Sequence, residues 1–392
     1  MASKKRNNKT SNRGHMMQKK ALSFLESLSN GFGPSGFERD IIRLVKNYVE
    51  PYSDSIEQDK LGSLLFYKKG TSERPVILLP GHVDEVGFVV SSINQNGFLT
   101  FNPVGGWFDQ VLLGQRVLIR TRKRDVQGII AAKPVHLMTP EERLKVIEKS
   151  KMFIDVGCSN AKEVEEMGIR VGDAIMPTSE FSIITKKAFD TKHNKTEELG
   201  KKKLAIGKAF DDRIGAFIAA EVVRRLTEEE ISHPNTVVGA ATTQEEVGAR
   251  GARTAAWIAD PDICITLEVD IAGDVPGIET HQALTAMGKG PGLLTFDASM
   301  IPNQGLKEFI IDTADKHKIP LQLSQMARGG TDAGIIHLTR AGCPSIVLGI
   351  PTRHIHSHVG ILSLDDVENC IKLVIEVVKT LDKKTAESFV RI

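Results

Sequence analysis

Two adjacent glutamates, Glu245 and Glu246, are the residues whose surroundings most suggest chemistry. They follow an apolar, β-branched run at residues 236–241, and a helix-forming segment starts at the glycines just after them. α/β proteins place their reacting groups where a strand ends and a helix begins. Since neighbouring strand residues point to opposite faces, one carboxylate could hold a metal ion while the other reaches over a bound water. An isolated Glu-Glu pair is more often simply solvated, so other residues must support this interpretation.

Two further groups of polar residues lie next to predicted elements. His82 and Asp84 follow a strand predicted at residues 76–79. A ligating imidazole needs its second nitrogen held, and a carboxylate two residues on can do this, although an exposed turn has the same composition. Asp211 and Asp212 precede a long amphipathic helix, where helix capping is the ordinary role of Asp.

Acids and histidines also follow the last predicted strands. Glu268 and Asp270 come after a strand predicted at residues 263–267, and they would share one strand face. His354, His356 and His358 follow a strand predicted at residues 345–348. Their spacing of two would place them on a common face, so one or more could bind metal, and an exposed polar loop is the alternative.

These residues together predict a centre with two metal ions. A parallel or mixed sheet would bring five of them to one edge: His82, Asp211, Glu246, Glu268 and His356. Two imidazoles and three carboxylates exceed what one tetrahedral ion with an open position needs, whereas two ions about 3.5–4 Å apart can share a carboxylate and a water. We expect Asp211 to bridge, with one His and one Glu added at each ion. Ligands without thiolate fit zinc, and also cobalt or manganese.

The elements that must position this centre alternate between helix and strand. Helices are predicted near residues 21–28, 35–48, 214–226, 253–258, 307–316, 333–339 and 365–381, and further strands near 63–67 and 321–323. Ser35 and Glu38 have the spacing of a capping box for the second helix. The alternation predicts an α/β fold, a mixed central sheet flanked by helices. Residues 86–178 are mainly β and form a predicted insertion, and lysine-rich residues 186–208 are predicted to be a mobile loop or hairpin tip.

Composition limits the class of protein. The 392 residues are 41% hydrophobic and 26% charged, as in globular proteins, and no apolar run approaches the roughly 20 residues of a membrane span. Without a recognisable secretory signal, we expect a cytoplasmic location. Four distant cysteines are expected to be free thiols. Basic residues are concentrated before residue 21, so residues 1–15 are predicted to be a disordered tail, and the acidic remainder argues against nucleic acid binding.

Six motifs carry a resemblance to a known family. They are Gly-Pro-Ser-Gly-Phe-Glu (33–38), Gly-His-Val-Asp-Glu-Val-Gly (81–87), Phe-Asp-Asp-Arg (210–213), Gln-Glu-Glu-Val-Gly (244–248), Gly-Gly-Thr-Asp-Ala-Gly (329–334) and Ile-His-Ser (355–357). Over about residues 20–382 the sequence resembles the dinuclear zinc metallopeptidases that include glutamyl aminopeptidase, the tetrahedral (TET) aminopeptidases and "cellulase M".

The resemblance implies specific roles. It assigns the two metal ions to His82, Asp211, Glu246, Glu268 and His356, the general base to Glu245, and the orientation of His82 to Asp84. It also implies a zinc aminopeptidase-like catalytic domain of residues 16–85 and 179–392, a PDZ-like dimerisation domain at 86–178, and assembly of dimers into a hollow dodecamer. Many relatives carry Asp where this chain has Glu268, so either Glu268 or Asp270 could ligate.

We therefore expect a metal-dependent aminopeptidase that hydrolyses N-terminal residues from peptides. A water bridging both ions would give its proton to Glu245 and attack the carbonyl, and Glu245 would then protonate the leaving amine. A metal-dependent deacylase is the first alternative. An endoglucanase is weaker, because its two carboxylates must flank a sugar bond and these acids are assigned to metal. A scaffold protein with structural ions is the alternative from another class. The substrate-binding residues are not predicted, because the specificity loops cannot be placed from sequence.

Overall fold

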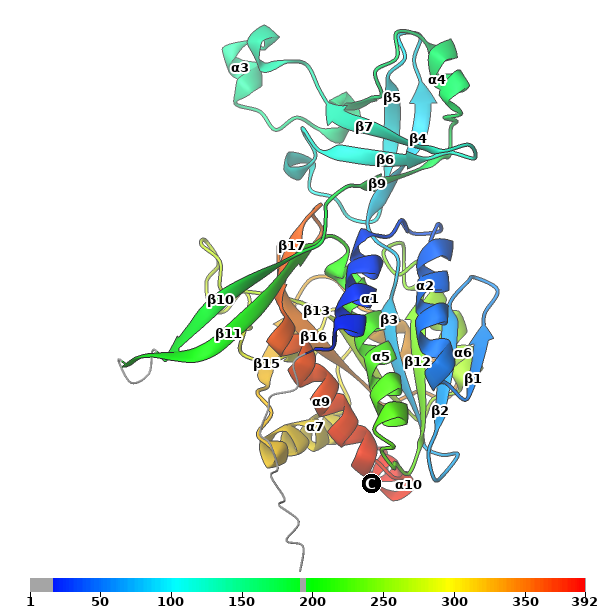
Figure 1. Cartoon of the computed structure of the whole chain (residues 1–392), viewed down its shortest axis with the longest axis vertical. Coiled ribbons are helices and arrows are strands. Elements are labelled where there is room, and N and C mark those ends of the chain that lie inside the picture. The colour runs from blue at the N-terminus through cyan, green and yellow to red at the C-terminus, as the bar shows by residue number, and fades with distance from the viewer. Residues whose placement is uncertain (1–16, 191–194, 392) are drawn as a thin grey trace, which may run out of the picture.

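A mixed β-sheet forms the centre of the protein (Figure 1). The computed structural model describes residues 17–190 and 195–391, so the basic segment 1–15 lies outside the described residues. Within them, eleven strands make up the sheet: β1 (Ser55–Gln58), β2 (Leu64–Lys69), β3 (Val76–His82), β10 (Ser182–Asp190), β11 (Lys195–Gly207), β12 (Thr236–Thr242), β13 (Ile263–Ile271), β14 (Gly292–Asp297), β15 (Gln322–Met326), β16 (Ser345–Arg353) and β17 (Gly360–Ser363).

Four parallel strands make the buried middle of this sheet, in the order β12, β3, β13, β16. All seven residues of β3 and of β12 are buried, as expected for continuous apolar runs covered on both faces. The register pairs Thr242 with His82 and Glu268 with Gly349. Because the four strands run in the same direction, their carboxyl ends meet at one edge of the sheet.

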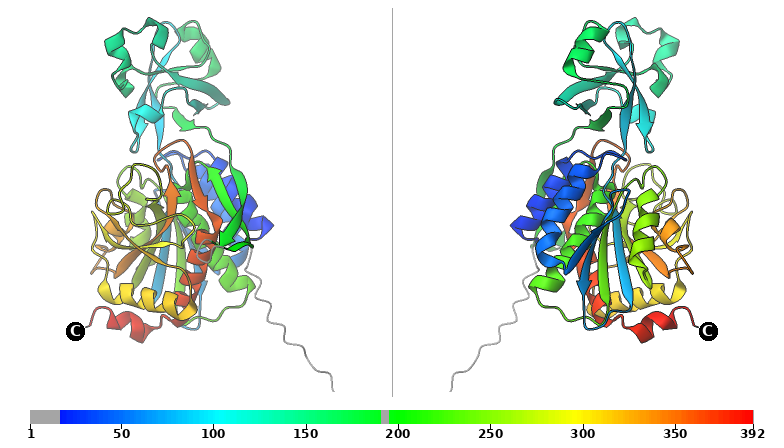
Figure 2. Two further views of the ribbon diagram at one scale, coloured as in Figure 1. Left: turned by 90° about the vertical axis from the view of Figure 1, so that its left-hand side faces the viewer. Right: turned by 90° about the vertical axis from the view of Figure 1, so that its right-hand side faces the viewer.

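Helices cover both faces of the sheet (Figure 2). One face packs in the largest core against α1 (Lys19–Asn30), α2 (Arg39–Val49), α5 (Phe210–Glu228), α7 (Gln304–His317), α9 (Leu364–Thr380) and α10 (Lys383–Ser388). The other face packs against α6 (Arg250–Ala259) and α8 (Ala333–Ile336). None of the helices in the described ranges is long and apolar enough to cross a membrane.

A closed barrel stands above the sheet at the end where β3 finishes (Figure 1). Its strands are β4 (Gly87–Ile93), β5 (Leu99–Val104), β6 (Arg116–Arg120), β7 (Asp125–Ala131), β8 (Phe153–Asp155) and β9 (Ala174–Pro177), and it carries α3 (Pro140–Arg143) and α4 (Ala161–Met167). Short 3-10 helices lie at Glu50–Tyr52, Asp109–Val111, Val135–Leu137 and Lys149–Lys151. Buried and exposed residues alternate along β7, and the inward ones form a core of the barrel's own.

The α/β fold with a mixed sheet and a small β-rich unit is confirmed. The domain boundaries at residues 86 and 178 stay predictions. Of the two predictions for the lysine-rich segment 186–208, a mobile loop or a hairpin tip, the hairpin is confirmed: β10 and β11 form an antiparallel hairpin, with residues 191–194 outside the description. β11 also pairs with β17 over Leu204–Gly207 and so extends the sheet, a pairing that cannot be predicted from the composition of the segment.

Candidate metal centre

The sheet edge brings the five predicted side chains together. Two groups of three have ligand atoms that all lie within 4.8 Å of one another: His82 with Asp211 and Glu268, and Asp211 with Glu246 and His356. His82 is the last residue of β3, and Glu268 lies within β13. The strand predicted at 263–267 continues to Ile271 because its parallel pairing with β16 continues, so Glu268 does not follow the strand as expected.

Asp211 belongs to both groups, and each of its oxygens faces a different histidine. Oδ1 lies 3.1 Å from Nε2 of His82, and Oδ2 lies 3.3 Å from Nε2 of His356. The prediction that Asp211 and Asp212 both cap α5 is wrong for Asp211, whose backbone is extended (φ −80°, ψ 105°). Asp212 does cap, since it accepts from the backbone N–H of Gly215 at 3.0 Å. The extended residue turns the Asp211 carboxylate toward the histidines instead of the helix.

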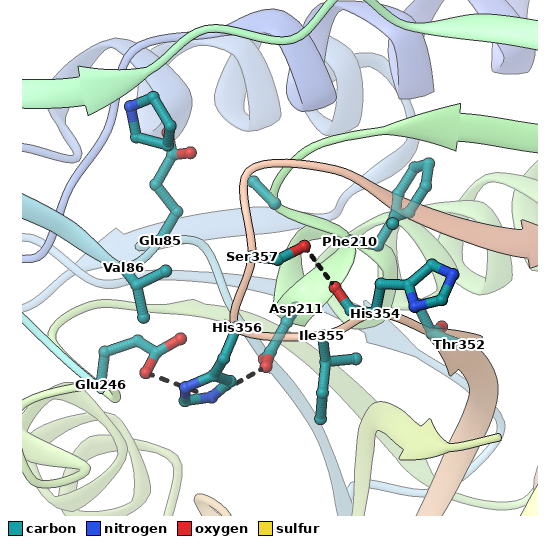
Figure 3. Close-up of a pocket in the computed structure, with 13 residues that line it drawn as sticks. Glu85, Val86, Phe210, Asp211, Glu246, Thr352, His354, Ile355, His356 and Ser357 are labelled. Carbon is teal, nitrogen blue, oxygen red and sulfur yellow. Dashed lines mark hydrogen bonds and ion pairs between the residues drawn. The ribbon is translucent and has the colours of Figure 1, made fainter. Parts of the chain in front are cut away.

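His356 lies between Glu246 and Asp211 (Figure 3), with Nε2 also 3.7 Å from Oε2 of Glu246. Its Nδ1 lies 2.9 Å from the carbonyl oxygen of Gly106 in the barrel. The prediction that His354, His356 and His358 share a face is wrong. His354 and His356 have positive φ values of 66° and 51°, so the alternation of a strand does not extend through them.

The two glutamates lie in a turn beyond β12, not on the strand itself. Gln244 has a φ of 58°, so the argument from opposite strand faces does not apply. The two side chains still differ: Glu246 joins Asp211 and His356, whereas Glu245 is outside both groups with Oε2 3.7 Å from Nε2 of His82. The turn therefore places the two carboxylates differently, and the division of roles between them stays a prediction.

Asp84 contacts both His82 and the turn. Its Oδ1 lies 3.4 Å from Nδ1 of His82, close to the predicted arrangement. Its two oxygens also accept from the backbone N–H groups of Glu245 and Glu246, at 3.0 and 3.1 Å. One buried carboxylate thus fixes the end of β3 relative to the glutamate turn.

Asp270 is occupied elsewhere. It accepts from the hydroxyl of Thr285 at 3.2 Å and from the backbone N–H of Ile271 at 2.8 Å. Of the two acids on β13, the structure places Glu268 in a candidate metal group and Asp270 in neither.

Comparison with known proteins decides the family. The model of the M42 glutamyl aminopeptidases matches residues 62–373. The chain belongs to this family. The chain is 34% identical to the glutamyl aminopeptidase of Lactococcus lactis subsp. cremoris over 339 residues, which cover 85% of this chain and 88% of the relative. The family confirms the predicted activity, that of a metal-dependent aminopeptidase, and the predicted enzyme class, a hydrolase.

Two solved structures resemble this M42 aminopeptidase along nearly its whole length. A TET aminopeptidase from a marine sediment archaeon of the Thaumarchaeota is 58% identical with a TM-score of 0.89, covering 94% of this chain and 99% of that one. The TET1 peptidase of Pyrococcus horikoshii is 27% identical with a TM-score of 0.75, covering 92% and 100%, and is described as assembling into a tetrahedron or a large octahedral shell. The fold is therefore that of the TET aminopeptidases.

The electrostatics of the M42 site favour cations. Burial raises the pKa of Glu245 to about 8, and burial together with neighbouring acids raises the pKa values of Glu246 and Glu268 well above their usual range. The hydrogen bond to Asp211 raises the pKa of His356 to about 10. Burial is the larger cause of the raised carboxyl pKa values, and repulsion among the neighbouring acids adds to it. Imidazole nitrogens and carboxylate oxygens, without thiolate, are a donor set that fits divalent ions.

Ser35 and Glu38 support the site through hydrogen bonds, whereas their spacing in the sequence predicts a capping box. The predicted capping box is wrong: α2 begins at Arg39, and the Ser35 hydroxyl donates to Asp84 at 2.6 Å. Glu38 accepts from the backbone N–H groups of Gly36 at 2.6 Å and of Gln244 at 3.1 Å. Only the family motif at 33–38 pointed to them, since a loop has no period to read.

A buried ion cluster of Glu85, Lys208 and Arg213 also escaped prediction. The Lys208 ammonium lies 2.7 and 2.8 Å from the two Glu85 oxygens, and Arg213 lies 2.8 Å from one of them. Burial lowers the pKa of Lys208 to about 8. Arg213 also donates to the carbonyls of Leu28, Gly31, Gly33 and Val83. The cluster satisfies the charges that it buries, and it ties α5 to the end of β3 and the loop after α1.

Proposed function

We propose that this M42 aminopeptidase holds two divalent ions and uses them to release N-terminal residues from peptides. The observation that carries the proposal is Asp211, whose two oxygens face two histidines from separate elements. One ion would be held by His82, Asp211 and Glu268, and the other by Asp211, Glu246 and His356. The bound ions would supply Lewis acidity, which acidifies a shared water and polarises the substrate carbonyl. Zinc, cobalt and manganese all suit these ligands.

Glu245 is the general base of this proposal. It lies beside His82 but outside both ligand groups, so its carboxylate is available to accept a proton from the attacking water and return it to the leaving amine. Burial raises the pKa of Glu245 to about 8, and nearby cations would lower it and so favour the ionised carboxylate that accepts a proton. Asp84 would orient His82 and the turn that carries Glu245.

Peptides are the substrates that we propose, together with self-association of the enzyme. The assembly described for the Pyrococcus horikoshii peptidase supports closed oligomers, and we infer dimers formed through residues 86–178 and a hollow dodecamer of those dimers. The cytoplasmic location stays a prediction from the sequence.

Ion stoichiometry tests the metal centre. Protein freed of metal with a chelator and then titrated with zinc should bind two ions per chain, counted by native mass spectrometry. Hydrolysis of an aminoacyl chromogenic substrate should be lost when the metal is removed and should return as zinc binds. Cobalt and manganese are compared in the same way. Full activity in protein shown to be free of metal would contradict the proposal.

The requirement for a free amino end tests the substrate class. A free amine next to the scissile bond can bind at one ion while the adjacent carbonyl meets the other, so acetylation removes both an interaction and the correct register. We expect an N-acetylated peptide to have a kcat/KM at least about tenfold lower than the matched peptide with a free amino end, measured by mass spectrometry of timed digests. Internal cleavage of the acetylated peptide would exclude an aminopeptidase.

A further inference from the structure

The two histidines of the centre are held in different ways. The side chain of His82 is 2% exposed at the end of a buried strand, whereas that of His356 is 42% exposed on a loop whose backbone has left the strand geometry. Packing therefore fixes the first ring but not the second. The group that meets the free side of the second ring comes from the barrel, the carbonyl oxygen of Gly106, 2.9 Å from Nδ1.

This contact selects one form of the ring. A neutral imidazole carries one proton, and a carbonyl can only accept, so the bond to Gly106 requires the proton on Nδ1. In the neutral form of the ring that can bind a metal ion, Nε2 then carries the lone pair, and Nε2 is the atom that faces Asp211 at 3.3 Å and Glu246 at 3.7 Å. A held second nitrogen is the usual support of a ligating histidine.

The barrel loop approaches so closely that a side chain on it would have to displace its neighbours. A Cβ atom on Gly106 would lie 3.1 Å from Nδ1 of His356, and one on Gly105 would lie 3.2 Å from Cβ of Glu246. Gly105 also has a positive φ of 81°. The loop therefore brings bare backbone against two residues of the same candidate ion site.

The loop is anchored within the barrel. The indole N–H of Trp107 donates to the carbonyl of Gly87 at 3.1 Å, and the ring stacks on Phe88 with centroids 4.9 Å apart. Lys149 donates to the Trp107 carbonyl at 3.3 Å and pairs with Asp109. Because these contacts all lie inside the barrel, the position of the Gly106 carbonyl follows the position of the barrel.

We propose that the barrel loop Gly105–Trp107 is part of the metal centre and acts as a positioning element for His356. The inference rests on the proposed function, in which His356 is a ligand. The site of His82, Asp211 and Glu268 is built entirely by the mixed sheet and its helices. The site of Asp211, Glu246 and His356, in contrast, needs the barrel to fix its imidazole. The barrel therefore controls the affinity of one ion and not of the other.

Calorimetric titration of the metal-free full-length protein with zinc tests this inference. Gly106→Val places a branched side chain against His356, and it should weaken one of the two binding events about 10–100-fold while the other stays within about twofold. Gly172→Ala is the control, because Gly172 lies in the barrel at a positive φ of 88° with nothing within 4 Å of its Cβ position. The Gly172→Ala variant strains the barrel backbone without touching the metal centre, so both zinc-binding events should keep their affinities.

A milder variant guards against misfolding. Trp107→Phe keeps an aromatic ring that can stack on Phe88, but it removes the N–H to Gly87 and shortens the side chain. It should weaken the same ion by a smaller factor, with near-UV circular dichroism to show that the barrel is folded. Unchanged affinities in both loop variants would overturn the inference, and so would equal weakening of both ions. Wild-type protein that binds only one ion would instead overturn the proposed two-ion centre, and the inference with it.

Discussion

Replacing Glu245 by Gln is expected to lower kcat by about 10²–10⁴-fold while both ions remain bound. The amide keeps the size of the side chain but cannot accept the proton of the attacking water. Since Glu245 lies outside both ligand groups, its charge is not needed to hold either ion. Steady-state kinetics on an aminoacyl substrate and metal content of the same preparation, measured by mass spectrometry, together give the result.

The neighbouring glutamate is the matched control. Glu246→Gln changes the same chemistry one residue away, but Glu246 belongs to the group with Asp211 and His356, so this variant should lose one ion. If metal content fell in the Glu245 variant and held in the Glu246 variant, the two roles would be exchanged.

Replacing Asp211 by Asn should weaken both ions, by more than about 100-fold each, and reduce activity to the background. The reason is that one side chain serves both groups, one oxygen to each histidine, and an amide offers a single neutral oxygen. Loss of a partner that only orients a ligand already costs 10–100-fold in metal affinity or activity, so loss of the shared ligand should cost more. Zinc titration of the metal-free variant measures both affinities.

Asp270→Asn is the control for that variant. It removes a buried carboxylate on the same strand as Glu268, but one that bonds to Thr285 and lies in neither group. Both ions should stay bound. Loss of an ion from this variant would instead make Asp270 a ligand, and retention of either ion at full affinity in Asp211→Asn would exclude a bridging role.

Much of this site could be predicted because its residues follow strands or begin a helix. Apolar runs in the sequence predict β3, β12, β13 and β16. Because the carboxyl ends of parallel strands meet at one edge of a sheet, His82, Glu246 and Glu268 are predicted to be neighbours. The same reasoning failed at His354 and His358, because a loop with positive φ has no period from which to predict a face.

What could not be predicted is mostly backbone. The Gly106 carbonyl that meets His356, and the N–H groups of the glutamate turn that Asp84 holds, belong to atoms present in every residue. A sequence records side chains, so it carries no sign of which carbonyl will face a ligand. The spacing of Ser35 and Glu38 fits a helix cap equally well, and only the tertiary contacts with Asp84 and Gln244 separate the two roles.

The buried cluster of Glu85, Lys208 and Arg213 has a consequence for how the enzyme matures. Glu85 and Lys208 are 123 residues apart in the chain, and Arg213 reaches back 185 residues to the carbonyl of Leu28. Closing such long loops costs entropy before the contacts reward it, and such contacts slow folding. Asp211 lies between Lys208 and Arg213 in the sequence, so the backbone on both sides of it is held by these long-range contacts. We therefore expect the candidate metal centre to form together with the tertiary structure and not with any single local element.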